Sequence, residues 1–143
     1  MQISQLLESK GAFVAMVRPD TPITAVVKEM TDKNIGSLVV SEDGNTIAGI
    51  VSERDVVAAI SRFTAAILEE PVRTIMSTSV QTCRSEDVVD SLMATMTDQR
   101  IRHIPVVDDG RLVGIVSIGD LVKARMDELE RERDALEHFI SAR

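Results

Sequence analysis

One seven-residue segment occurs twice in this chain. Residues 49–55 read Gly-Ile-Val-Ser-Glu-Arg-Asp and residues 114–120 read Gly-Ile-Val-Ser-Ile-Gly-Asp, an offset of 65 residues (114 minus 49). Upstream, Met-Thr-Asp at 30–32 returns at 96–98 with an offset of 66 (96 minus 30), and one extra residue near Thr46 reconciles the two offsets. A repeat of this length is a whole folding unit rather than a short solenoid period. We therefore expect two similar units related by a pseudo-two-fold axis, with a cleft between them.

The length of 143 residues fits one compact domain made of two halves. A unit of roughly 60 residues buries its apolar surface poorly when alone, so we expect the halves to share a core. The sequence predicts three regions: an N-terminal helix and the first repeat over 1–70, the second repeat over 71–125, and a helical extension over 126–143.

Composition excludes several classes of protein. The net charge of −7 repels nucleic acid and anionic lipid, and the aromatic residues, 2% of the chain and all Phe, offer no stacking platform for single strands. No apolar run reaches the roughly 20 residues that cross a bilayer, and the N-terminus lacks a signal-peptide pattern, so we expect a cytoplasmic protein. Cys83 is the single cysteine, which excludes an internal disulfide and argues against a zinc site.

Apolar spacing and turn residues predict the same order of elements in both units. In the first unit we expect a helix over 3–8, a strand over 12–17, a helix capped by Thr21, strands over 35–40 and 47–51, and a helix over 52–63. In the second we expect a strand over 80–83, a helix over 86–97, strands over 101–107 and 112–116, and a helix from Ser117, with one helical turn at 72–76 between the units. The fold class is α/β (α+β), with tandem β-α-β-β-α repeats.

The last helix runs beyond the repeat. Between Leu121 and Ile140 it is strongly charged, and its apolar residues, at spacings of 3, 7 and 4, are Met126, Leu129, Leu136 and Ile140. One narrow apolar stripe of this kind is typical of a seam against a partner helix. The partner surface could be a neighbouring subunit or the chain's own N-terminal helix, around Ile3, Leu6 and Leu7.

The repeated segment allows a structural and a functional interpretation. Ser52 with Asp55, and Ser117 with Asp120, have the spacing of a helix capping box. The glycine that begins each segment could serve a backbone conformation needed after the preceding turn. However, a helix N-terminus also offers unpaired N–H groups and a positive dipole end to a phosphate, and a carboxylate one turn in can accept hydrogen bonds from two vicinal hydroxyls. Because the Ser-x-x-Asp pair follows a Gly-Ile-Val strand in both repeats, a ligand site is favoured.

A basic cluster distinguishes the second unit from the first. Residues 100–103 read Arg-Ile-Arg-His, and strand alternation places Arg102 and His103 on opposite faces. Solvated charge is one interpretation, and contact with phosphate is the other. The matching residues of the first unit include the uncharged Gly36 and Ser37, although Arg54 stands there where the second unit has Gly119. We therefore expect the two halves to differ as anion sites.

No spacing indicates a catalytic nucleophile with its base, or a cluster of metal ligands. The two histidines, one of them on the terminal helix, provide little acid–base chemistry near neutral pH. A binding module is therefore favoured over an enzyme.

These features together resemble a CBS domain pair, also called a Bateman module. The resemblance rests on the two motif copies in register, on Ile-Pro-Val-Val-Asp at 104–108, and on Met-Thr at 96–97 followed by the basic cluster. It covers nearly the whole chain and is most like small stand-alone bacterial members of the family. The first repeat has Leu-Val-Val at 38–40, without the proline, and is less typical.

The resemblance implies adenosine-nucleotide binding in clefts between the repeats. The motif aspartates would hold ribose hydroxyls and the motif serines would lie near ribose and phosphate. Residues before the second strand and segments before the first helix would line the clefts. The implied site residues are Ser52, Arg54 and Asp55, Ser117 and Asp120, Arg102, His103 and Ile104, Gly36 and Ser37, Val17 and Arg18, and Cys83 and Arg84.

The resulting prediction is a non-enzymatic sensor of AMP, ADP, ATP or NAD(H), with no obligatory cofactor. Family members commonly dimerise through their paired repeats, which implies a homodimer that regulates an unidentified protein. The first rival hypothesis is a structural adaptor whose terminal helix recruits a partner without sensing a ligand. The second is an enzyme whose catalytic groups are not evident from the sequence.

Overall fold

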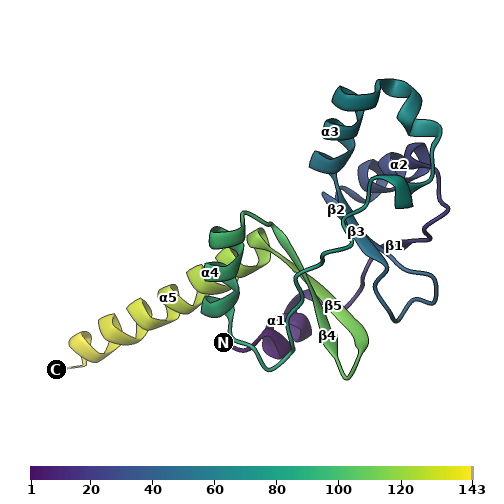
Figure 1. The fold of residues 1–143 in the computed structure, drawn as a ribbon. Coiled ribbons are helices and arrows are strands. Elements are labelled where there is room, and N and C mark those ends of the chain that lie inside the picture. The colour runs from purple at the N-terminus through teal and green to yellow at the C-terminus, as the bar shows by residue number, and fades with distance from the viewer. Residues whose placement is uncertain (143) are drawn as a thin grey trace.

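A computed structural model of the chain describes residues 1–142. Figure 1 shows two groups of elements joined by extended segments, with the C-terminal part of the last helix projecting away from both. The helices are α1 (Ile3–Lys10), α2 (Ile23–Lys33), α3 (Glu53–Phe63), α4 (Val89–Gln99) and α5 (Ile118–Ser141), with the 3-10 turns η1 (Ala65–Glu69) and η2 (Val72–Thr74) between α3 and α4. The strands are β1 (Met16–Val17), β2 (Ser37–Val40), β3 (Gly49–Ser52), β4 (His103–Asp108) and β5 (Arg111–Ser117). This mixed α/β content agrees with the predicted fold class.

Each repeat contains one small sheet. In the first, β1 runs parallel to β2 and β2 pairs antiparallel with β3, in the order β1-β2-β3. In the second, β4 pairs antiparallel with β5, and Ile104 lies opposite Val116. The last residue of β3 and that of β5 are Ser52 and Ser117, so both motif serines stand where a strand turns into a helix.

The buried side chains form two separate cores, which makes the prediction of one shared core wrong. The first core contains Ile23, Val26, Leu38 and Val51 from the first repeat, together with Val72 of η2. The second contains residues of α4, β4, β5 and the start of α5, together with Ile3, Leu6 and Leu7 of α1. Each core is therefore completed by the segment that precedes the other repeat, and this exchange compensates for the small size of each unit.

The motif glycines make room for these exchanged segments. A Cβ atom on Gly49 would lie 2.7 Å from the Met76 sulfur and 2.7 Å from the backbone oxygen of Ser77. A Cβ atom on Gly114 would lie 2.7 Å from a terminal carbon of Leu7. Neither glycine has a positive φ, so the close approach of a neighbouring segment, and not an unusual backbone conformation, explains the missing side chain.

Several predicted boundaries are wrong because tertiary contacts replace regular structure. The strand expected at 80–83 is reduced to one parallel bridge between Cys83 and Val106. The strand expected at 12–17 contains only Met16–Val17. The predicted cap Thr21 instead accepts the backbone N–H of Arg18 with its side chain, and Pro22 occupies the capping position of α2.

The helix expected from residue 86 begins at Val89, and Val88, directly before it, is 46% exposed. The helices that follow the motif serines begin as predicted, and η2 forms the helical turn expected between the repeats. None of the helices in the described range is both long and apolar enough to cross a membrane.

Candidate functional site

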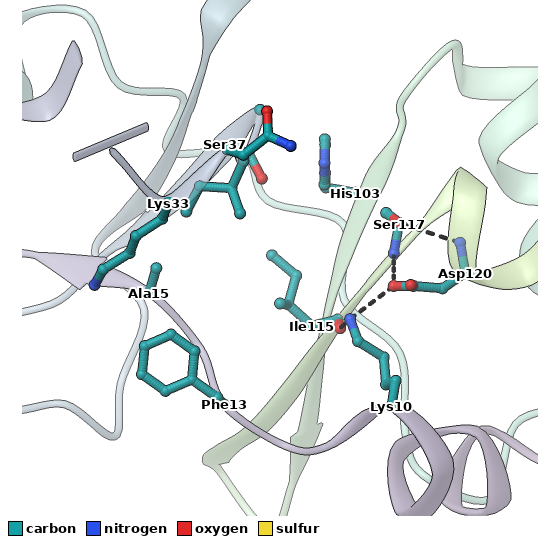
Figure 2. Close-up of a pocket in the computed structure, with 12 residues that line it drawn as sticks. Lys10, Phe13, Ala15, Lys33, Ser37, His103, Ile115, Ser117 and Asp120 are labelled. Atoms are coloured by element: carbon teal, nitrogen blue, oxygen red, sulfur yellow. Dashed lines mark hydrogen bonds and ion pairs between the residues drawn. The ribbon is translucent and has the colours of Figure 1, made fainter. Parts of the chain in front are cut away.

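A cavity of about 640 Å³ lies between the two repeats. Figure 2 shows residues of the first repeat facing residues of the second across it, with the end of α1 along one side. The first repeat and its leading segment contribute Phe13, Ala15, Lys33, Asn34, Ile35, Gly36 and Ser37. The second repeat contributes His103, Ile115, Ser117 and Asp120, and α1 contributes Lys10. Five of the predicted site residues, Gly36, Ser37, His103, Ser117 and Asp120, therefore lie together.

The start of α5 places the motif pair of the second repeat in this cavity. Ser117 caps the helix, and its side-chain oxygen accepts the backbone N–H of Asp120 at 3.1 Å. The Oδ2 atom of Asp120 accepts the backbone N–H of Ser117 at 2.9 Å, which completes the capping box. Within the described residues, Asp120 Oδ1 and the backbone N–H of Gly119 have no hydrogen-bond partner. A free carboxylate oxygen and a free backbone N–H are thus left at the helix start.

Lys10 is a member of the site that the sequence analysis missed. Its ammonium group donates to Asp120 Oδ2 at 2.6 Å and to the backbone oxygen of Ile115 at 2.7 Å (Figure 2). It is the last residue of α1, and Gly11, with a φ of 96°, follows it as the C-terminal cap. The residue is more than 100 positions from Asp120 in the sequence, and it belongs to no repeat or motif. Only the packing of α1 against the second repeat shows that Lys10 contacts Asp120.

Two opposing effects act on the carboxyl group of Asp120. Burial raises its pKa, but the hydrogen bonds from Lys10 and Ser117 outweigh burial, and the pKa lies below its ordinary value of 3.8. Asp120 is therefore ionised at neutral pH. An ionised carboxylate accepts hydrogen bonds but donates none, which suits the recognition of hydroxyl groups.

His103 reaches from the second repeat to the first. Its Cε1 atom would be 3.7 Å from a Cβ atom on Gly36, an ordinary van der Waals distance, so the imidazole lies beside Gly36 of the first repeat. Burial is the main effect on His103 and lowers its pKa below 6.5, although the nearby Asp120 carboxylate acts in the opposite direction. The imidazole is therefore mostly neutral at pH 7 and can both donate and accept a hydrogen bond.

Phe13 and Lys33 form the opposite rim of the cavity. The Lys33 ammonium lies 5.2 Å from the centroid of the Phe13 ring and 2.7 Å from the carboxylate of Glu29. Phe13 is 74% exposed, which is unusual for the side chain of a phenylalanine. An exposed aromatic ring at a cavity rim offers a flat apolar surface to a ligand.

The remaining predicted residues of the second repeat lie outside this cavity. Arg102 is exposed and Ile104 is buried in the second core. Cys83 is buried, and burial raises the pKa of its thiol to about 12, so the thiol is protonated and unreactive. Arg84 pairs with Glu86 at 3.2 Å on the surface.

The predicted residues of the first repeat are also dispersed. Val17 packs against the first core, and Arg18 is exposed near Asp20. Ser52 and Asp55 form a second capping box, in which Asp55 Oδ2 accepts the backbone N–H of Ser52 at 2.8 Å. Asp55 lines a separate hollow of about 280 Å³, whereas Ser52 and the exposed Arg54 do not line it. The two motif copies therefore have unequal surroundings.

The described residues contain no group of three or more His, Cys, Asp or Glu side chains placed to hold a metal ion. The polar side chains that line the cavity are instead hydrogen-bond donors and acceptors: two ammonium groups, an imidazole, a carboxylate, an amide and two serine hydroxyls. Such a set can bind a small polar molecule that carries both hydroxyl and anionic groups.

Comparison with known proteins agrees with this architecture. The sequence model of the CBS domain matches residues 13–62 and 72–127. A CBS-domain containing protein from Agrobacterium tumefaciens is 40% identical, with a TM-score of 0.85 over 87% of this chain and 99% of that chain. A CBS domain protein from Pyrobaculum aerophilum, solved in complex with AMP, is 28% identical, with a TM-score of 0.74 over 84% of this chain and 89% of that chain.

A more distant similarity shows the fold alone. The CBS domain pair of the protein MJ0100, solved with 5′-methylthioadenosine and S-adenosyl-L-methionine, is 22% identical, with a TM-score of 0.78 over 90% of this chain and 98% of that chain.

Two family matches in tandem, a duplicated sheet-and-helix unit and a cavity between the units all lead to one assignment. The chain belongs to the CBS domain family, as a pair of CBS repeats.

Proposed function

We propose that this CBS pair is a non-enzymatic regulatory module that binds a phosphorylated adenosine in the cavity beside Asp120. AMP, ADP, ATP and NAD(H) are the candidate ligands, and the module acts as a cytoplasmic homodimer on a partner protein. The observation that carries the proposal is the meeting of Ser117 and Asp120 with Gly36 and Ser37 of the other repeat in one cavity. The complex of the Pyrobaculum protein with AMP supports the same class of ligand.

The chemistry of the cavity supports each part of such a ligand. Asp120 Oδ1 is a free acceptor for a ribose hydroxyl, and the free N–H of Gly119 at the start of α5 suits a phosphate oxygen. Phe13 and Ile115 offer apolar surface for a base. Binding can regulate a partner only if the nucleotide prefers one conformation of the module over another.

The two motif copies are proposed to bind nucleotides unequally. Asp55 accepts hydrogen bonds from the backbone and side chain of Ser52 and lines the smaller hollow, and among the described residues no lysine pairs with it. We expect the Asp120 cavity to be the tighter site, so that a titration resolves two unequal sites or one site per chain.

Calorimetric titration with AMP, ADP, ATP, NAD and NADH tests the proposal. We expect binding by the wild-type chain, and a loss of about 1.5–3 kcal/mol of binding free energy for Asp120→Ala, the scale of hydrogen bonds to a charged group. Asp120→Asn keeps an acceptor for the capping box and separates the loss of ligand contacts from damage to the helix start. Asp55→Ala is the matched control in the other motif. Unchanged affinity in both Asp120 variants would refute the assignment, and no binding by wild type would leave the adaptor hypothesis.

The homodimer proposal rests on the exposed side of α5. Val122, Met126, Leu129, Leu136 and Ile140 are all exposed, and with Arg133 they follow alternating spacings of four and three. This is the spacing of a coiled-coil seam. Only Leu121 and Ala124, near the start of α5, are buried within the chain. A second copy of α5 would bury the stripe that the chain itself leaves open.

Sedimentation of the full chain and of a version ending at Arg125 checks this proposal. We expect the full chain to be a dimer at micromolar concentration, and the shortened chain to dissociate more readily or to melt at a lower temperature. A monomeric full chain would contradict the dimer. A dimer that loses neither affinity nor melting temperature on shortening would exclude α5 from the interface.

A further inference from the structure

Lys10 lies where the two repeats meet, but it comes from neither motif. Two of its three ammonium protons are used by Asp120 Oδ2 and by the backbone oxygen of Ile115. The third has no partner among the described residues, and the side chain, 29% exposed, lines the cavity. A lysine held at two points with one free N–H is a fixed cationic donor aimed at whatever occupies the cavity.

In the first repeat, an uncharged group donates the hydrogen bond to the corresponding strand carbonyl. Ile50 is the counterpart of Ile115 at the offset of 65, and its backbone oxygen accepts the backbone N–H of Ser77 at 2.9 Å. Residues 75–79, which pass over Gly49 as Leu7 passes over Gly114, contain no charged side chain. The strand carbonyl can therefore be satisfied by a neutral group, and the ammonium of Lys10 adds something that the packing of the repeat does not require.

The charges that line the cavity favour an anionic ligand. Within the described residues, its lining holds two lysines and one carboxylate, and the carboxylate is Asp120, which is already paired with Lys10. Among the described lining residues a cationic ligand finds no unpaired carboxylate, while Lys33 is paired with Glu29 and the Glu53 carboxyl carbon lies 3.8 Å from where a Cβ on Gly36 would be. A phosphate finds the free N–H of Lys10, and charge-assisted hydrogen bonds to phosphate are stronger than neutral ones.

We propose that Lys10 is the specificity-determining residue of the cleft, and that it selects adenosine ligands carrying phosphate over uncharged or cationic ones. The inference rests on the proposed function, since it concerns which adenosine compound the same cavity accepts. Lys10 keeps the Asp120 carboxylate in place for a hydroxyl through Oδ2 and leaves Oδ1 open, while its free N–H contacts a phosphate oxygen. S-adenosylmethionine, whose sulfonium is positive, is the disfavoured class.

The test compares three ligands on matched variants. Wild type, Lys10→Gln and Lys10→Arg are titrated with AMP, adenosine and S-adenosylmethionine, and Lys28→Gln, an exposed lysine on α2 outside the cavity, is the control. Glutamine can still donate to the Ile115 carbonyl, which keeps the structural bond but removes the charge. Circular dichroism and melting temperature verify that each variant is folded.

We expect wild type to bind AMP more tightly than adenosine or S-adenosylmethionine. Lys10→Gln should weaken the binding of AMP by about tenfold to a hundredfold, which corresponds to the loss of one hydrogen bond to a charged group. It should weaken the binding of adenosine far less. Lys10→Arg should restore part of the preference for AMP, and Lys28→Gln should change nothing. In wild type, added salt should weaken AMP binding but not adenosine binding.

The failures of the two proposals are distinguishable. If wild type binds AMP but Lys10→Gln keeps the same ratio of AMP to adenosine affinity, the selection by Lys10 is refuted and the nucleotide site stands. Binding of S-adenosylmethionine by wild type as tight as that of AMP refutes the selection in the same way, and it does not depend on any variant. If wild type binds none of the three compounds, and none of ADP, ATP, NAD and NADH in the titration described above, the nucleotide-binding function itself is refuted.

Discussion

Replacing Leu6 with alanine is expected to lower the free energy of unfolding of the second repeat by about 2–5 kcal/mol, the range for truncating a large buried side chain. Leu6 is 4% exposed and packs in the second core with Ile3, Leu7 and residues of α4 and β4, although it precedes the first repeat in the chain. Urea unfolding measures the loss. Hydrogen exchange of the backbone then locates it, and we expect faster exchange in β4, β5 and α4 than in β2 and β3.

Ser9 provides the control on the same helix. It is exposed on α1, so Ser9→Ala should change the stability by no more than about 0.5 kcal/mol. If Leu6→Ala instead accelerates exchange mainly in β2 and β3, α1 belongs to the core of the first repeat in solution, and the exchange of segments between the repeats is contradicted.

Replacing Gly49 with valine is expected to destabilise the first repeat by about 3 kcal/mol or more, because overpacking in contact with backbone is poorly relieved. The new Cβ would lie 2.7 Å from the backbone oxygen of Ser77, and the antiparallel bridge between Ile50 and Ser77 would have to open. Thermal and urea unfolding measure the loss.

Two other glycines calibrate this effect. Gly114→Ala meets only the end of the flexible Leu7 side chain and should cost less than Gly49→Ala. Gly119→Ala, in the first turn of α5, meets only the Ser117 hydroxyl at 3.7 Å and should be neutral or stabilising. Equal stability of all three alanine variants would show that the motif glycines do not serve close packing.

Much of the fold follows from local patterns in the sequence. The doubled motif predicts Ser52 and Ser117 as helix caps, and both form capping boxes with the aspartate three residues later. Period and turn signals also predict the antiparallel pairing of β2 with β3 and of β4 with β5, whose observed bounds lie within a few residues of the expected ones. These features depend on neighbours close in sequence, which is why a single sequence reveals them.

The features that sequence patterns miss are those set by contacts across the whole chain. α1 is an ordinary short amphipathic helix, and nothing in residues 3–10 indicates that it completes the second core. Lys10 therefore could not be linked to Asp120. Likewise, strand alternation separates Arg102 from His103, but only the placement of the repeats shows that His103, and not Arg102, lines the cavity with Asp120.

A crystal structure of the chain grown with saturating AMP tests the central claim most directly, because it shows both where the nucleotide lies and which atoms hold it. We expect AMP between the repeats, with a ribose hydroxyl within hydrogen-bond distance of Asp120 Oδ1 and the phosphate on the side of Lys10 and the start of α5. AMP bound away from this cavity, or a cavity that remains without AMP at saturating concentration, would contradict the proposed nucleotide site.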